Sequence, residues 1–213
     1  MKKIIVSAFL TLGLVTFAQN DAKAESLLDE VSTKIKAYKN ISLDFKYELN
    51  NTNENISQET RGDVVIEDEK YKLNILGVTR IYDGKTLYTI SPEDEEVTIS
   101  SDNTEDENTI TPSKMLSFYE DGYTYKMDIV QNVKGRKIQY VKLSPMDTDS
   151  EIKYILLGVD ATTKHIYNLI EVGKNGTRTT LTVNSFKTDE PISKTLFTFD
   201  SAKYSDYYIN KID

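Results

Sequence analysis

The chain of 213 residues contains no cysteine and no tryptophan, and it has only one histidine. The absence of cysteine excludes disulfides, a thiol nucleophile, a thiolate metal site and anchoring through a lipid-modified cysteine of this chain. Proline and glycine are sparse, at 4 and 9 residues, and no stretch rich in Pro, Gly or Ser indicates a linker. A chain without disulfides needs a hydrophobic core, which we expect to form one domain.

Catalytic motifs are also missing. The single histidine, His165, has no Gly-x-Ser-x-Gly serine to act with, and its partners in a zinc site would all have to be carboxylates. Phosphate-binding glycine loops are absent, and the acidic residues 101–108 lack the spacing of an EF-hand calcium loop. Apart from Asp44 and Glu48, which occupy the polar phase of their strand, we expect no carboxylate to stand singly inside an apolar run. We therefore expect a non-enzymatic binding protein without catalytic residues, metal or cofactor, and an ordinary role for His165 in or near a strand.

The first residues predict a secretory leader. Lys2 and Lys3 are followed by an apolar stretch, Ile4–Ala18, which is short for a membrane span of roughly 20 residues. Small residues at 22–24 predict cleavage after Ala24, and cleavage after Ala18 is the alternative. The expected organisation is a signal peptide at 1–24 and one domain at 25–213, exported to the periplasm and soluble.

Acidic residues outnumber basic ones, and the net charge is −8. Cleavage after Ala24 would remove three lysines and Asp21 and leave −10. Such a surface repels nucleic acid and anionic lipid headgroups. We expect a monomer that binds no nucleic acid.

Hydrophobic periodicity predicts a protein made mostly of strands. Residues 41–49 place five apolar side chains on one face of a strand and four polar ones on the other. Similar patterns recur at 58–67, 70–76, 78–82, 86–91, 97–100, 123–131, 136–144, 151–160, 164–172, 177–186 and 196–199, before an extended stretch at 204–209. Amphipathic helices are predicted at 25–39, with Ser26 as N-cap, and from Thr111 to Asp121, with Thr111 as N-cap. Asp83-Gly84 predicts a two-residue type I′ hairpin.

Because no helix alternates with the strands, a parallel βαβ fold is not expected. The predicted fold is mostly β with two or three helices: a curved antiparallel sheet that forms an incomplete barrel. Its apolar face must be covered by a second sheet, by helices or in part by a ligand.

Several motifs resemble those of the periplasmic outer-membrane lipoprotein carrier family, LolA. The most specific is the run 82–88, Tyr-Asp-Gly-Lys-Thr-Leu-Tyr, followed by Ile90, Pro92 and Val97. Supporting pieces are Gly62-Asp63, Thr111-Pro112, Val159-Asp160 with Thr163 and Ile166, and Phe197-Thr-Phe199. Together they resemble the family from Glu25 to Asp200.

The resemblance implies a half-barrel closed by lid helices, with a cavity that carries acyl chains of lipoproteins from the inner to the outer membrane. Its partners would be lipid-modified lipoproteins as cargo, an inner-membrane lipoprotein-releasing ABC transporter and an outer-membrane receptor. From the more apolar face of each strand and of the lid, we predict that the acyl-chain cavity is lined by Leu43, Phe45, Tyr47, Val64, Ile66, Leu73, Ile75, Leu87, Met115, Leu116 and Phe118. If the phase of a strand is wrong by one residue, the residues chosen on that strand would lie on the opposite face of the sheet.

One departure from the family concerns gating. Members carry an Arg-Pro pair after the Gly-Asp strand, and its Arg latches the lid, whereas residues 67–70 here are Glu-Asp-Glu-Lys. The standard lid latch and the handover to a dedicated receptor are therefore in question. A lipid- or lipoprotein-sensing regulatory module on the same fold is the alternative function. An esterase is a third possible function, which only the expected cleft supports.

Overall fold

The computed structural model describes residues 21–100, 112 and 114–212. Residues 1–20 of the predicted signal peptide, the acidic residues 101–108 and the predicted N-cap Thr111 lie outside this part. The described chain contains one α-helix, three short 3-10 segments and twelve strands. The helical segments are α1 (Ala22–Lys36), η1 (Lys114–Leu116), η2 (Phe118–Glu120) and η3 (Ser201–Tyr204). The strands are β1 (Ile41–Asn51), β2 (Ile56–Glu67), β3 (Lys70–Ile75), β4 (Val78–Tyr82), β5 (Leu87–Ser91), β6 (Glu96–Ser100), β7 (Tyr123–Val133), β8 (Arg136–Pro145), β9 (Ile152–Asp160), β10 (Ile166–Gly173), β11 (Arg178–Thr188) and β12 (Tyr208–Ile212).

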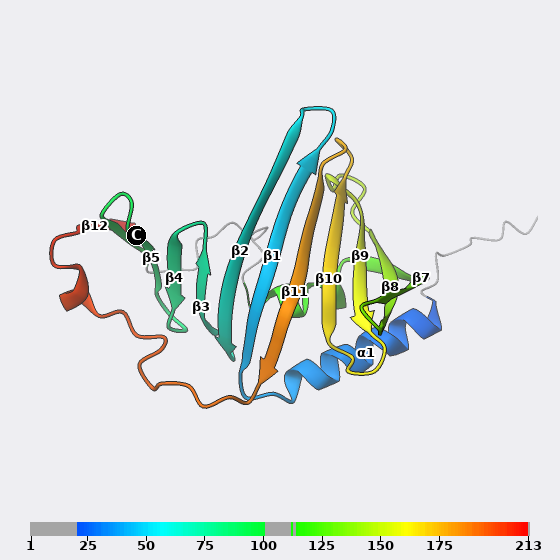
Figure 1. Ribbon diagram of the computed structural model, residues 1–213, viewed down its shortest axis with the longest axis horizontal. Helices are drawn as coiled ribbons and strands as arrows, with labels where there is room; N and C mark the ends of the chain where they lie inside the picture. The colour runs from blue at the N-terminus through cyan, green and yellow to red at the C-terminus, as the bar shows by residue number, and fades with distance from the viewer. Residues whose placement is uncertain (1–20, 101–111, 113, 213) are drawn as a thin grey trace, which may run out of the picture.

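All twelve strands belong to one open, curved sheet in the order β12-β6-β5-β4-β3-β2-β1-β11-β10-β9-β8-β7 (Figure 1). Each hydrogen-bonded pair is antiparallel except β12 with β6, which is parallel. The edges β7 and β12 do not meet, so the barrel is incomplete. The predicted fold class is confirmed.

The two faces of the sheet follow from the alternation along each strand. On β1, Ile41, Leu43 and Phe45 are buried, whereas Asp44 between them is exposed. Pairing of Leu43 with Val64 on β2 and with Phe186 on β11 continues the same apolar face across the sheet. We call this face, against which α1 packs, the concave face.

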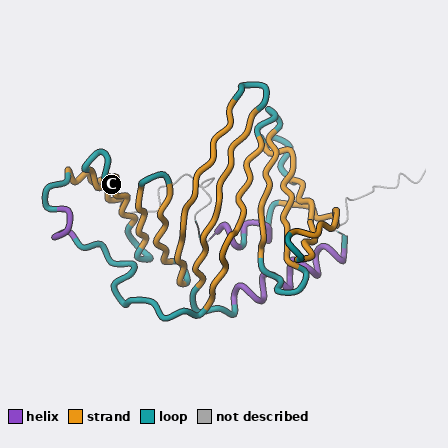
Figure 2. The backbone as a smooth tube through the Cα atoms, in the orientation of Figure 1, coloured by secondary structure: helices purple, strands orange, loops and turns teal. Residues whose placement is uncertain are grey.

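Helix α1 starts earlier than the periodicity predicts. Its N-cap is Asp21 rather than Ser26, because the Asp21 carboxylate accepts the Lys23 backbone N–H at 2.9 Å. The second carboxylate oxygen of Asp21 accepts the N–H of Met127 on β7, at 3.2 Å. Helix α1 is therefore tied to the β7 edge, and the tube view shows it crossing the sheet from there toward β1 (Figure 2).

The second predicted helix is not an α-helix in the described residues. It consists of η1 and η2, which together we call the lid. Ser117 lies between them with φ −133°, which interrupts helical geometry. Such short 3-10 pieces do not propagate hydrogen bonds as an α-helix does.

Turn geometry differs from the prediction at the Asp83-Gly84 hairpin. The hairpin joins β4 to β5 as expected, but only Gly84 has a positive φ, and the loop spans four residues. Asp83 shapes this loop, since its carboxylate accepts the N–H groups of Lys85 and Thr86 at 2.9 and 2.8 Å. Two consecutive positive-φ residues, as in a two-residue hairpin, occur instead at Leu76-Gly77 between β3 and β4 and at Lys134-Gly135 between β7 and β8.

The C-terminal segment does not form the strand predicted at 196–199. It passes along the lower ends of β1–β3 in Figure 1 and reaches the β12 edge. On the way Phe199 stacks on Tyr88 of β5 at 4.6 Å, and Tyr204 stacks on Phe199 at 5.4 Å. These rings cover the face of β4–β6 opposite the concave face.

Candidate functional site

All eleven residues predicted to line the cavity lie in one hydrophobic cluster on the concave side. Six are buried and five are partly buried against the same cluster. The buried ones are Leu43, Phe45, Val64, Ile66, Leu87 and Leu116, and the partly buried ones are Tyr47, Leu73, Ile75, Met115 and Phe118. The predicted strand phases are therefore those of the structure. Contact of these residues with an acyl chain remains a prediction.

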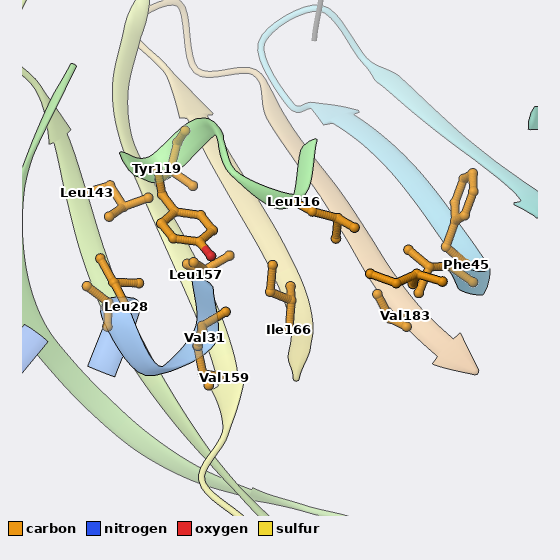
Figure 3. Close-up of a cluster of buried hydrophobic side chains, with 14 of the residues drawn as sticks. Leu28, Val31, Phe45, Leu116, Tyr119, Leu143, Leu157, Val159, Ile166 and Val183 are labelled. Atoms are coloured by element: carbon orange, nitrogen blue, oxygen red, sulfur yellow. The ribbon is translucent and has the colours of Figure 1, made fainter. Parts of the chain in front are cut away.

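Sequence reasoning missed the residues that fill the other part of this cluster. They come from α1 and from β8 and β9, and the close-up shows several of them packed together (Figure 3). Leu28 and Val31 of α1 meet an inner layer of strand residues that are at most 1% exposed: Val141, Leu143, Ile155, Leu157 and Val159. The alternation within 136–144 and 151–160 carries the signal for them.

A groove of about 300 Å³ opens where the end of α1, the lower ends of β1 and β2, and the lid come together. Its apolar lining is formed by Ile35, Ile41, Ile66 and Leu116, and its polar rim by Lys36, Lys39, Asp68, Glu69 and Glu120. Ligand pockets usually measure about 300–1,000 Å³. The groove therefore has room for the end of an apolar chain, and only Ile66 and Leu116 of the predicted residues line it.

The lid is fastened to α1 beside this groove. The carboxylate of Glu120 on η2 lies 2.8 Å from the Lys36 ammonium and accepts a hydrogen bond from the Ser32 hydroxyl. The Lys36 hydrogen bond, followed by that of Ser32, lowers the pKa of the Glu120 carboxyl. We call these three side chains the clasp.

The stretch 67–70, at which the resemblance implies an Arg-Pro pair, forms the tight turn between β2 and β3. Asp68 adopts φ +52° there, and Asp68 and Glu69 are exposed on the groove rim. Acidic residues thus stand where the resemblance implies a cation.

His165 lies immediately before β10 and is half-buried. Its Nε2 is 2.8 Å from the Tyr38 hydroxyl, and its ring stacks on Phe186 at 4.0 Å. Burial, reinforced by the charge of Lys34, lowers the pKa of His165. These contacts join the segment that follows α1 to the sheet, beside a turn.

Two buried side-chain oxygens have no hydrogen bond in the described structure, the Tyr119 hydroxyl and the Asn168 Oδ1. The hydroxyl of Tyr119, on η2, is directed toward α1 and β9 (Figure 3). Tyr119 is 1% exposed, and burial raises the pKa of its hydroxyl. An aromatic residue of the lid thus closes the filled part of the concave side.

A carboxylate on the concave face was also missed. Glu171 follows Leu169 and Ile170 and precedes Val172 on β10, so it stands alone within an apolar run. It pairs with Ile155 on β9 and Thr179 on β11, and burial raises the pKa of its carboxyl. The apolar neighbours in the sequence are the signal that could have identified it.

The opposite face of the sheet carries a larger hollow, of about 890 Å³. Charged side chains line much of it, among them Asp44, Lys46, Glu59, Arg61, Asp63 and Lys134, which makes it a poor site for an apolar ligand. Across the described ranges, no three His, Cys, Asp or Glu side chains lie close enough to hold a metal ion. Within the same ranges, no helix has the length and apolarity to cross a membrane.

Comparison with known proteins points to one family. The family model described as outer membrane lipoprotein carrier protein LolA matches residues 36–200. Among curated proteins, none matches this sequence.

Solved structures share the fold at low sequence identity. An uncharacterized conserved protein from Thermus thermophilus has a TM-score of 0.60 at 9% identity, over 89% of this chain and 99% of that chain. LprF from Mycobacterium bovis has a TM-score of 0.52 at 12% identity, over 82% and 97%. The Pseudomonas aeruginosa MucA/MucB complex gives 0.50 at 12% identity, over 84% of this chain and 62% of that chain.

Proposed function

Because the chain belongs to the outer membrane lipoprotein carrier family, LolA, we propose that its concave face binds the acyl chains of lipid-modified lipoproteins. In this role it is a periplasmic carrier, exported through a cleaved signal peptide, that moves lipoproteins from the inner to the outer membrane. An inner-membrane lipoprotein-releasing ABC transporter would load it, and an outer-membrane receptor would accept the cargo. The proposal includes no catalytic step.

The observation that carries this proposal is the incomplete cover of one part of the concave face. Tyr47, Leu73 and Ile75 on β1 and β3 face the apolar cluster but are only partly buried. Each buried CH₂ contributes about 0.8 kcal/mol, so a long acyl chain gains binding energy from apolar contact alone. A ligand that completed this burial would need no specific polar contact.

The size of the groove suggests how a chain enters. Its volume of about 300 Å³ is at the lower end for a ligand pocket. The remaining length of an acyl chain would replace the lid side chains Met115, Leu116 and Phe118 against β1 and β2. Binding therefore requires the lid to move, which opens the clasp at Glu120.

A binding measurement with matched peptides tests the proposal. The purified mature protein is titrated with a fluorescent peptide whose N-terminal residue carries acyl chains, and with the same peptide without lipid. We expect the lipidated peptide to bind and the other not to bind. Equal or absent binding of both would contradict the proposal.

Two substitutions locate the binding face. Leu73→Glu places a charge on the concave face of β3, and Val65→Glu places the same charge on the opposite face of β2, where residue 65 pairs with Lys72. We expect Leu73→Glu to weaken lipid binding by about 10-fold or more, or 1.4 kcal/mol, and Val65→Glu to leave it unchanged. Circular dichroism of both variants checks that they fold.

A regulatory module is the second candidate function. It draws on the fold shared with the MucA/MucB complex, in which a protein of this fold has a protein partner. Capture of a membrane-anchored signalling protein from the native host, in place of lipoproteins and their transporter, would favour it over the carrier.

A further inference from the structure

Glu171 lies half-buried on the concave face, at the end of the sheet away from the groove. The strand register places it beside Ile155 on β9 and Thr179 on β11, and Leu49 on β1 follows Thr179 in the same row. Burial, and after it the nearby charge of Glu171, raises the pKa of the Tyr123 hydroxyl on β7. The surroundings of this carboxylate are therefore mainly apolar and aromatic.

The carboxylate of Glu171 has no hydrogen bond or ion pair within the residues that the structure describes. In the register of β1, β9, β10 and β11, it is the only charged residue on the concave face. By contrast, the Glu120 carboxylate on the groove rim is paired with Lys36. A half-buried charge without a partner costs free energy, which a ligand of opposite charge can recover.

We propose that Glu171 binds a cationic amine that lies next to the acyl chain of the ligand. The inference rests on the proposed function, because the amine is brought to Glu171 by a tail on the concave face. The negative net charge of the protein, −8, also favours a cationic amphiphile over an anionic one. The ligand class is thus an acyl or alkyl chain with a primary or quaternary ammonium group.

Three probes with the same alkyl chain separate the contribution of the chain from that of the ammonium group. They are dodecylammonium, dodecanol and dodecyl sulfate, each below its micelle-forming concentration. Displacement of a fluorescent fatty acid from the mature protein at pH 7 gives their affinities. We expect the ammonium to bind about 10-fold more tightly than the alcohol, and the sulfate to bind least. This comparison uses the unmodified protein and does not depend on any variant.

The substitution Glu171→Gln keeps the shape of the side chain and removes its charge. It should reduce dodecylammonium affinity about 10-fold and leave dodecanol affinity unchanged. Glu151→Gln, at an exposed position before β9, is the matched control and should change neither affinity.

The outcomes separate a failure of the Glu171 proposal from a failure of the proposed function. If dodecanol binds but the ammonium binds no better, or if Glu171→Gln retains the preference for the ammonium, the role of Glu171 is wrong and the apolar site stands. If none of the three probes displaces the fatty acid, and the fatty acid itself does not bind, the proposed function fails as well.

Discussion

The part of the concave face formed by β8 and β9 is closed by the described residues, whereas these residues only partly cover Tyr47 on β1 and Leu73 and Ile75 on β3. Under α1, Leu157 and Val159 have no exposed surface. Across the same face, Leu73 and Ile75 remain partly exposed. Both parts have the same alternation of apolar and polar residues, so within the described residues the difference arises from where α1 and the short lid lie. One face of a single sheet can thus form a permanent core over some strands and leave room for a ligand over others.

The largest expected effect is a difference in stability between equivalent substitutions in the two parts. Leu157→Ala leaves a cavity in the filled part and should lower the free energy of unfolding by about 3 kcal/mol. Leu73→Ala removes a side chain that is already partly exposed and should cost about 1 kcal/mol, but it should weaken lipid binding. Urea denaturation and the lipidated-peptide titration measure the two effects. Equal stability losses would show that the two parts do not differ.

The hairpin tip between β3 and β4 belongs to neither part and offers a stabilising change. Leu76 is 74% exposed and adopts φ +54°, a conformation that a leucine side chain disfavours. Leu76→Asn should raise the free energy of unfolding by about 1 kcal/mol without changing lipid binding. Met146→Asn, at another exposed apolar residue without a positive φ, is the control and should give no such gain.

The start of α1 tests how the filled part is closed. Ala24 is fully buried inside α1, and Asp21 caps the helix and bonds to β7. Asp21→Ala should lower the melting temperature by a few degrees, whereas Asp29→Ala, on the exposed side of α1, should not.

The same contacts predict which cleavage site is used. A cut after Ala18 keeps Asp21, whereas a cut after Ala24 removes it together with the first turn of α1. N-terminal sequencing of the exported protein should therefore find Gln19 first. A mature chain that begins at Glu25 would contradict this prediction.

The clasp joins the filled part to the lid and should have the smallest effect on stability. Lys36 is largely exposed and Glu120 partly so, and Glu120→Gln should therefore cost at most about 1 kcal/mol at pH 7. Because the folded state lowers the pKa of Glu120, this contribution is present above the unfolded pKa of about 4.3 and is lost as the pH falls through the lowered folded value. The variant should bind the lipidated peptide faster at pH 7, and stopped-flow fluorescence measures that rate. An unchanged association rate would mean that the lid does not limit entry.

The sequence predicts the strands and their phases because a sheet with one buried face requires strict alternation. Leu43, Val64 and Leu73 lie on the concave face as expected, in one row across β1, β2 and β3. Periodicity also identifies α1, although its start depends on a contact between Asp21 and β7 that no local pattern contains.

Other features depend on residues far apart in the chain. Parallel pairing of β12 with β6 brings Tyr208 beside Glu96, and no turn links the two strands. The lid is too short for helical periodicity to be reliable. Above all, the sequence does not indicate that α1 covers β8 and β9 but leaves Leu73 partly exposed, because burial depends on the path of the helix over the finished sheet.

The most direct test of this account locates a bound chain on the protein. A stearic acid with a spin label on its tail is added to protein with labelled methyl groups, and the loss of each methyl NMR signal reports distance from the label. We predict strong loss at Leu73, Ile75 and Met115 and little at Leu157 and Val159. Loss centred on Leu157 and Val159, or no selective loss at any methyl group, would contradict the account.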